Sequence, residues 1–317
     1  WSSDVCSSDL TVTPNPCVDK TVFIDRLELG GRLRSRKCTY IPGGKGSNVS
    51  RAVKALGGET AALVIVGGPT GQHVVDMISH DDGVRCIPVR VADMTRTITT
   101  VLEESIHRQT AFFEPGSSVS ETEVQATVDS VAAALEGATV VTFNGSVPDP
   151  SLDGLYAEGV RLAREAGVLS IVDSYGEPFR RALAEKPYMV KPNDEEAGGL
   201  VGFKLDSDVA RWKAIDWFHA QGVELVVLSL GAEGALVSRG GERLAVRPPA
   251  IKEVNPVGSG DALVAGFALG LEWGYSLEEM SRLGVAAGTA NAMSWDIGHF
   301  SKEEVDAIAQ RVVIERL

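Results

Sequence analysis

The sequence contains few of the residues that build metal centres and disulfide frameworks. Only four cysteines occur among its 317 residues, none of them in CxxC spacing. Scattered cysteines are typical of a reduced, cytoplasmic chain rather than of a disulfide scaffold or a zinc site. The five histidines are also dispersed, which predicts surface or structural roles and neither a histidine relay nor a metal cluster; they are His73, His80, His107, His219 and His299.

Positive charge and long apolar runs are scarce as well. The formal net charge is −13, which argues against general binding to nucleic acid or to an anionic membrane, because both require a basic surface. No apolar run approaches the roughly 20 residues that span a bilayer. A small anionic ligand is compatible with this charge, since a local cluster of Lys and Arg can reverse the field within one cleft.

The first ten residues, WSSDVCSSDL, differ in character from the remainder of the chain. They lack the basic and apolar regions of a secretory signal, and they lack the alternation of a strand. We interpret residues 1–10 as a non-native extension and place the start of the native chain near Thr11. Residues 11–317 are predicted to form a single domain.

Short apolar runs alternate with amphipathic stretches along the chain. Each run is rich in β-branched residues and is closed by a turn signal, as buried parallel strands are; the clearest are 61–66, 140–143, 169–172 and 225–230. Helical patterns lie between them, at 48–56, 121–135, 152–166, 209–220, 261–273 and 277–293. This alternation predicts an α/β fold with a mainly parallel sheet and ligands at the carboxyl ends of its strands. Two extended, more polar segments, about 21–40 and 95–113, predict a small β lid.

The segment most indicative of chemistry is 255–261, with the sequence NPVGSGD, which leads into an apolar helix. A Gly-Ser-Gly turn at a helix start presents free backbone N–H groups to an anion. The adjacent Asp261 can accept a proton from a hydroxyl, and phosphoryl transfer needs both such an anion site and such a base. Taken alone, the segment is equally compatible with Asp261 as a helix N-cap after a tight turn.

A second glycine-rich segment, 42–48 with the sequence PGGKGSN, also opens a predicted helix. Its glycines allow the backbone to approach a ligand closely, and Lys45 and Asn48 suit a phosphate or sugar hydroxyls. It is not a Walker A loop, because Gly46 follows Lys45 where Ser or Thr is required. The alternative interpretation is a glycine-rich turn with a solvated lysine.

Together with three further motifs, these segments resemble the ribokinase-like (PfkB) carbohydrate kinases, and within them the 1-phosphofructokinase and tagatose-6-phosphate kinase group. The further motifs are TPNPCVD at 13–19, KPNDEE at 191–196 and SLGAEG at 229–234. The resemblance runs from about Thr11 to about Phe300. It implies a ribokinase-like three-layer sandwich with a mainly parallel central sheet and a small β lid.

The resemblance also implies a role for each matching residue. Asp261 would be the base, beside an anion hole formed by Gly258, Ser259 and Gly260. The acceptor sugar and its phosphate would be bound by Asp19, Gly43, Gly44, Lys45, Asn48, Arg96 and Ser146, and by the lid residue Arg34. Arg36 is close enough in sequence to compete for that lid assignment. The nucleotide would contact Lys191, Asn193, Ser229, Leu230, Gly231, Gly234 and Asn291. Glu196 would help to organise Mg²⁺.

The implied activity is ATP-dependent phosphorylation of a ketohexose phosphate to a bisphosphate. Fructose 1-phosphate and tagatose 6-phosphate are the favoured acceptors, and fructose 6-phosphate is the next. The family lid also implies a homodimer. One departure keeps a second enzyme open: the family often has Thr-Arg-x-Asn in the returning lid strand, whereas this chain has TRTI at 95–98. A kinase of an unphosphorylated sugar or nucleoside is therefore the alternative. A non-catalytic sugar-binding regulator is less favoured, because the base and the anion hole are both present.

Overall fold

The computed structural model describes residues 9–106 and 108–317. Cys6, His107 and most of the predicted extension lie outside the described residues. Strand β1 (Asp9–Thr13) begins two residues before the predicted start of the native chain. It pairs with neighbours on both sides, β4 (Thr60–Val66) and β8 (Val140–Asn144), so it is a central strand of the main sheet.

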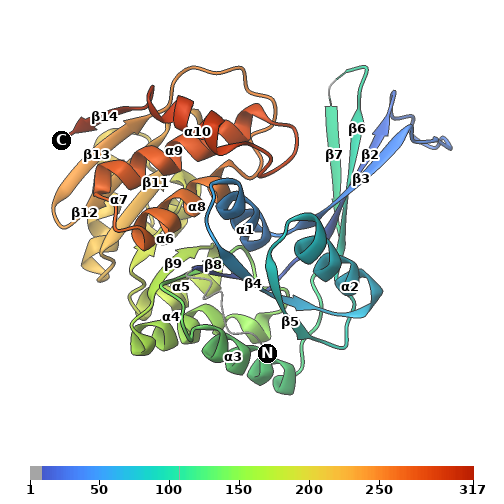
Figure 1. Ribbon diagram of the computed structural model, residues 1–317, viewed down its shortest axis with the longest axis horizontal. Helices are drawn as coiled ribbons and strands as arrows, with labels where there is room; N and C mark the ends of the chain where they lie inside the picture. Colours follow the sequence, from blue (N-terminus) through green and yellow to red (C-terminus); the bar gives the residue numbers. More distant parts are fainter. Residues whose placement is uncertain (1–8, 107) are drawn as a thin grey trace.

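A ten-stranded sheet forms the centre of the molecule (Figure 1), in the order β14-β13-β12-β11-β10-β9-β8-β1-β4-β5. The pairs from β11 to β5 are parallel, and β12, β13 and β14 are added antiparallel at one edge. The prediction of a mainly parallel sheet is confirmed. The other strands are β5 (Arg85–Arg90), β9 (Leu169–Asp173), β10 (Met189–Val190), β11 (Leu225–Ser229), β12 (Ala235–Arg239), β13 (Glu242–Arg247) and β14 (Val313–Arg316).

Helices cover both faces of this sheet, which gives the predicted three-layer sandwich. One buried apolar cluster joins the sheet to α3 (Glu121–Ala134), α4 (Leu155–Ala166), α5 (Gly176–Ala184), α6 (Asp194–Val201) and α7 (Asp208–Ala220). A second cluster joins the opposite face to α1 (Lys45–Ala55), α8 (Ser259–Glu272), α9 (Leu277–Met293) and α10 (Lys302–Ala309). A smaller cluster lies under α2 (Gly68–Asp76). No helix within residues 9–106 or 108–317 has the length and apolar character that crossing a membrane requires.

A separate four-stranded sheet forms the lid, in the order β3-β2-β6-β7, and it stands away from the main body in Figure 1. Its strands are β2 (Cys17–Ile24), β3 (Lys37–Gly43), β6 (Thr97–Glu103) and β7 (Arg108–Phe113). The lid confirms the predicted extended segments, but β2 and β3 reach further than 21–40 because Cys17 pairs with Gly43. The two hairpins meet along a parallel pair of β2 and β6. The lid therefore includes Asp19 of β2 and Gly43 of β3, two of the residues predicted to bind the acceptor sugar.

Both glycine-rich segments do open helices, as predicted. Helix α8 begins at Ser259, and its N-cap is Gly258 in the left-handed region with φ of 83°. Asp261 therefore lies inside the first turn and is not the N-cap, which removes the structural alternative considered above. Gly44, at φ of 113°, caps α1, and a Cβ there would lie only 2.6 Å from Thr13 Cγ2. Glycine is therefore required at position 44 for conformation and for space.

Candidate active site

A cleft of about 970 Å³ lies between the carboxyl ends of the central strands, the starts of α1 and α8, and the lid. Its walls bring together most of the residues singled out from the sequence. Those lining it are Asp19, Gly43, Gly44, Lys45, Asn48, Arg96, Ser146, Lys191, Asn193, Glu196, Ser229, Gly231, Gly234, Gly258, Ser259, Gly260 and Asp261. Segments more than 200 residues apart in the sequence thus meet in one place, as expected for ligands at the carboxyl edge of a parallel sheet.

Three predicted site residues do not line the cleft. Arg34 is exposed in the connection between β2 and β3. Leu230 packs against the apolar cluster under the sheet, and its backbone N–H donates to Gly234 O at 2.8 Å. Asn291, which is 1% exposed, donates to Val257 O at 2.8 Å and to Ser259 Oγ at 3.2 Å. Asn291 therefore holds the turn that precedes α8.

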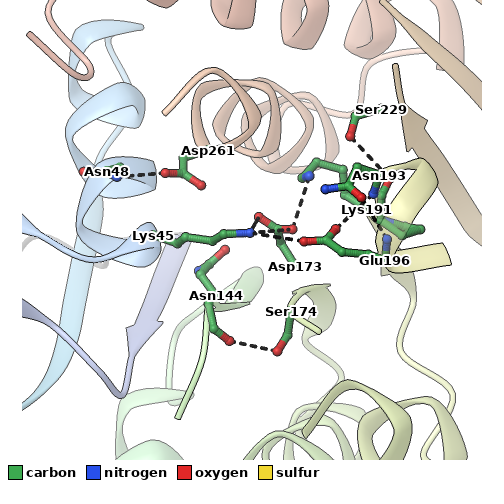
Figure 2. A network of polar contacts seen from close by, with 12 residues as sticks. Lys45, Asn48, Asn144, Asp173, Ser174, Lys191, Asn193, Glu196, Ser229 and Asp261 are labelled. Carbon is green, nitrogen blue, oxygen red and sulfur yellow. Dashed lines mark hydrogen bonds and ion pairs between the residues drawn. The ribbon is translucent and has the colours of Figure 1, made fainter. Parts of the chain in front are cut away.

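Asp261 lies at the centre of the cleft and is 6% exposed. Its Oδ2 accepts a hydrogen bond from Asn48 Nδ2 at 2.8 Å, as Figure 2 shows. Burial raises the pKa of Asp261 to about 6, with the positive charge of Lys45 opposing the rise and the negative charge of Asp173 adding to it. A carboxylate with a pKa just below neutrality is ionised at pH 7 and well matched to accept a proton.

The cleft also contains a buried ion-pair network around Asp173, whose side chain is fully buried. Lys191 Nζ lies 3.2 Å and Lys45 Nζ 3.4 Å from its carboxylate oxygens, and Lys45 Nζ is 3.9 Å from Glu196 Oε1 (Figure 2). Burial alone would lower the pKa of Lys45, but the carboxylates of Asp173, Asp261 and Glu196 outweigh it and raise that pKa above its ordinary value. Lys45 is therefore held as a cation beside the base.

Asp173 was not singled out as a site residue from the sequence. It was read only as the turn signal that closes the apolar run 169–172. The available signal was its position: Asp173 ends β9 directly beside Asn144, which ends β8. Polar residues at the ends of neighbouring parallel strands are where such sheets bind ligands, and Asn144 also lines the cleft.

Arg96 and Lys45, both predicted to contact a sugar phosphate, have different surroundings. Arg96 Nη2 donates to Asn15 O at 3.2 Å, and its buried Nε has no hydrogen-bond partner within the described part of the chain. The Arg96 side chain lines the cleft, where a planar guanidinium is suited to an anionic ligand. Lys45 is instead bound by Asp173 and Glu196, toward the side of the cleft that holds Lys191.

The predicted nucleotide side is preorganised by the start of α6. Asn193 Oδ1 accepts from Glu196 N at 2.8 Å, and Glu196 Oε2 accepts from Asn193 N at 2.9 Å, so the two residues form a reciprocal capping box. Ser229 is tied to the same segment, because its N–H donates to Pro192 O at 3.0 Å. Glu196 Oε1 remains directed at Lys45.

The described residues contain no group of three or more His, Cys, Asp or Glu side chains arranged to hold a metal ion. Glu196 still fits a Mg²⁺ that arrives with a nucleotide, because Mg²⁺ commonly keeps several waters and binds one or two carboxylates plus substrate phosphates.

Comparison with known proteins is consistent with this geometry. The model of the pfkB family carbohydrate kinases matches residues 12–294. A tagatose-6-phosphate kinase from Staphylococcus epidermidis is 32% identical over 308 residues, which cover 96% of this chain and 98% of that protein. A 1-phosphofructokinase from Xanthomonas campestris is 33% identical over 311 residues, covering 96% of this chain and 97% of the relative.

Solved structures agree in fold. Phosphofructokinase-2 from Escherichia coli, in a crystal structure with potassium, superposes with a TM-score of 0.89 at 32% identity. That alignment covers 95% of this chain and 98% of the other. The shared fold therefore covers nearly the whole chain.

Replacement of Asp173 by Asn is expected to lower the free energy of unfolding by about 3 kcal/mol or more, because it leaves Lys45 and Lys191 beside a neutral side chain in a buried site. Urea denaturation at pH 7 measures this. The matched control is Asp306→Asn, which breaks a half-exposed pair with Lys302 and should cost less than about 1 kcal/mol. Equal losses in the two variants would contradict the importance assigned to Asp173.

Proposed function

Because the chain belongs to the pfkB family of carbohydrate kinases, we propose that it transfers the γ-phosphoryl group of ATP to a hydroxyl of a ketohexose phosphate. The observation that carries this proposal is the position of Asp261. It is a buried, ionisable carboxylate directly beside the glycine turn that opens α8, in one cleft with Lys45 and Arg96. Fructose 1-phosphate and tagatose 6-phosphate are the leading acceptors, and fructose 6-phosphate is the third.

The chemistry follows from three groups at the centre of the cleft. Asp261 accepts the proton of the acceptor hydroxyl as the new O–P bond forms, while the bond from the γ-phosphorus to the β,γ-bridging oxygen breaks and ADP leaves. Backbone N–H groups at the start of α8, in the turn 258–260, stabilise the charge of the group in transfer. Lys45, which is held by Asp173 and Glu196, adds positive charge beside it.

The acceptor occupies the lid side of the cleft in this proposal. Asp19 of β2 and Asn48 of α1 bind its hydroxyls, and the guanidinium of Arg96 binds its phosphate. Ser146 lies at the same end, where its Oγ accepts a hydrogen bond from Asn15 Nδ2 at 3.1 Å. Gly43 and Gly44 let the backbone approach the sugar closely.

ATP occupies the opposite side, along Lys191, Asn193 and the turn 229–234. Mg²⁺ would be held by the ATP phosphates with Glu196 contributing through water, and it would neutralise charge on those phosphates. The cytoplasmic location stays a prediction from the cysteine pattern.

We also propose that the chain forms a homodimer through the lid. The lid sheet stands apart from the main body (Figure 1), and large apolar side chains on it are exposed, among them Phe112 at 58% and Phe113 at 70%. A relative supports association in this family, since a tetrameric inhibited form of phosphofructokinase-2 from Escherichia coli has been solved.

Sedimentation velocity at micromolar concentration should give at least twice the mass of one chain. Phe112 and Phe113 are neighbours in β7 and therefore face opposite sides of the lid. Replacing each by Asp in turn should break the assembly in at least one case and thereby identify the face used. A wild-type protein that sediments as a monomer would contradict the proposed dimer.

Asp261→Asn should reduce kcat by at least a hundredfold, because an amide cannot accept the hydroxyl proton. Binding of the acceptor, followed by calorimetry, should be largely kept. In the wild type, kcat should fall as the pH drops through about 6, where Asp261 becomes protonated. Unchanged turnover in Asp261→Asn would remove Asp261 as the base.

A panel of acceptors separates the proposal from its alternative, a kinase of an unphosphorylated sugar or nucleoside. Phosphosugars should be turned over far better than free sugars or nucleosides. Arg96→Ala should weaken phosphosugar binding by roughly 2–5 kcal/mol if the phosphate contact is buried, whereas Arg90→Ala, an exposed arginine on β5, should leave it unchanged. Preference for free sugars, with no effect of Arg96→Ala, would favour the alternative.

A further inference from the structure

Besides Lys45 and Asn48, helix α1 carries Arg51, which is linked to Asp261 through Asn48. Lys45, Asn48 and Arg51 follow one another at intervals of three residues, so they lie along one side of the helix. Arg51 does not line the cleft. It contacts Asn48, and it was not among the residues predicted from the sequence.

The guanidinium of Arg51 is fully engaged by partners from separate segments. Its Nε and Nη2 donate to the two carboxylate oxygens of Asp82, at 2.8 and 3.0 Å, and both side chains are about one-tenth exposed. Nη2 also donates to Pro42 O at 2.9 Å, and Nη1 donates to Ile297 O at 3.1 Å. This bidentate pair with carbonyl contacts needs the planar fork of arginine.

The remaining contact of Arg51 determines which way Asn48 points. Arg51 Nη1 donates to Asn48 Oδ1 at 3.4 Å, and Asn48 Nδ2 donates to Asp261 Oδ2 at 2.8 Å. A guanidinium has only donors and an ionised carboxylate only acceptors. A flipped amide would place Nδ2 against Arg51 and Oδ1 against Asp261, and both contacts would be repulsive. Arg51 therefore selects the orientation in which Asn48 donates to the base.

The backbone contacts of Arg51 extend this effect to both glycine-rich segments. Pro42 immediately precedes Gly43 and Gly44. Ile297 packs so closely on Gly258 that a Cβ at position 258 would collide with it. The adjacent Gly298 N donates to Asn291 Oδ1 at 2.8 Å, and Asn291 in turn holds the turn before α8.

We propose that Arg51, anchored by Asp82, is a positioning residue that orients the Asn48 amide toward Asp261 and joins the segment 42–44 to the turn that opens α8. The inference rests on the proposed function of Asp261 as the base. The charged groups that face Asp261 are Lys45 from α1, Asp173 from the end of β9, and Lys191, which follows β10. None of these is altered by a change at position 51.

The experiment measures the titration of the Asp261 carboxyl by ¹³C NMR in protein labelled at aspartate, with Asp261→Asn to assign the signal. The hydrogen bond from Asn48 lowers the pKa of Asp261. Arg51→Met frees the amide to rotate, so the midpoint should rise by about half to one pH unit. Asp82→Asn, which keeps the shape of the anchor, should shift it less and in the same direction.

Two comparisons separate orientation from charge and from general destabilisation. Arg51→Lys keeps the positive charge but not the fork. Its Asp261 midpoint should therefore be raised nearly as much as that of Arg51→Met. Arg282→Met is the matched control, because Arg282 is a half-buried arginine of α9 that donates to Ala309 O and Val312 O outside the cleft. It should lower stability and leave the midpoint unchanged.

Turnover gives a second readout. In Arg51→Met, kcat at pH 8 should fall by about ten- to a hundredfold through misplacement of the base, and the acid limb of its pH profile should move upward with the NMR midpoint. The inference would be overturned if the Asp261 midpoint were unchanged in Arg51→Met. It would also be overturned if Arg51→Lys had the wild-type midpoint. Failure of the wild type to phosphorylate any sugar phosphate would instead overturn the proposed function, and the NMR titration decides the role of Arg51 without turnover.

Discussion

The burial of Asp173 between two lysines is the interaction on which the arrangement of the cleft depends. A carboxylate at the end of β9 is removed from water, and the compensation comes from Lys45 of α1 and Lys191, which follows β10. These cations come from two distant parts of the chain, so their meeting fixes the start of α1 against the central strands. Because Lys45 also faces Asp261 and Glu196, the same pairing sets the electrostatic environment of the proposed base.

This centre contains fewer cations than carboxylates. Lys45 and Lys191 face three carboxylates, those of Asp173, Glu196 and Asp261, so the protein alone does not leave a large excess of positive charge at the point of transfer. An anionic nucleotide would have to share the lysines with carboxylates that already bind them. Positive charge carried in with the nucleotide would relieve that competition, which is consistent with a metal that travels with its phosphates rather than one held by a protein cage.

The fold and most of the site were predictable because their signals are contiguous in the sequence. Buried parallel strands leave apolar runs such as 61–66, and the turns before α1 and α8 each occupy a few adjacent residues around Gly44 and Gly258. What the sequence did not reveal depends on long-range pairing. Asp173 reads locally as a turn residue, and the pairing of Arg51 with Asp82 cannot be read from either position alone. The lid boundaries were misplaced because Cys17 joins β2 only through its partner Gly43.

The parallel pairing of β2 and β6 has a mechanical consequence. A flap hinged on a loop can swing without disturbing the surface that it covers. This lid cannot, because three of its strands reach residues that line the cleft: β2 carries Asp19, β3 ends at Gly43, and β6 starts one residue after Arg96. Any tilt of the four strands is transmitted to those three positions together. The angle of the lid sheet and the shape of the acceptor pocket are therefore coupled, so that neither changes without the other.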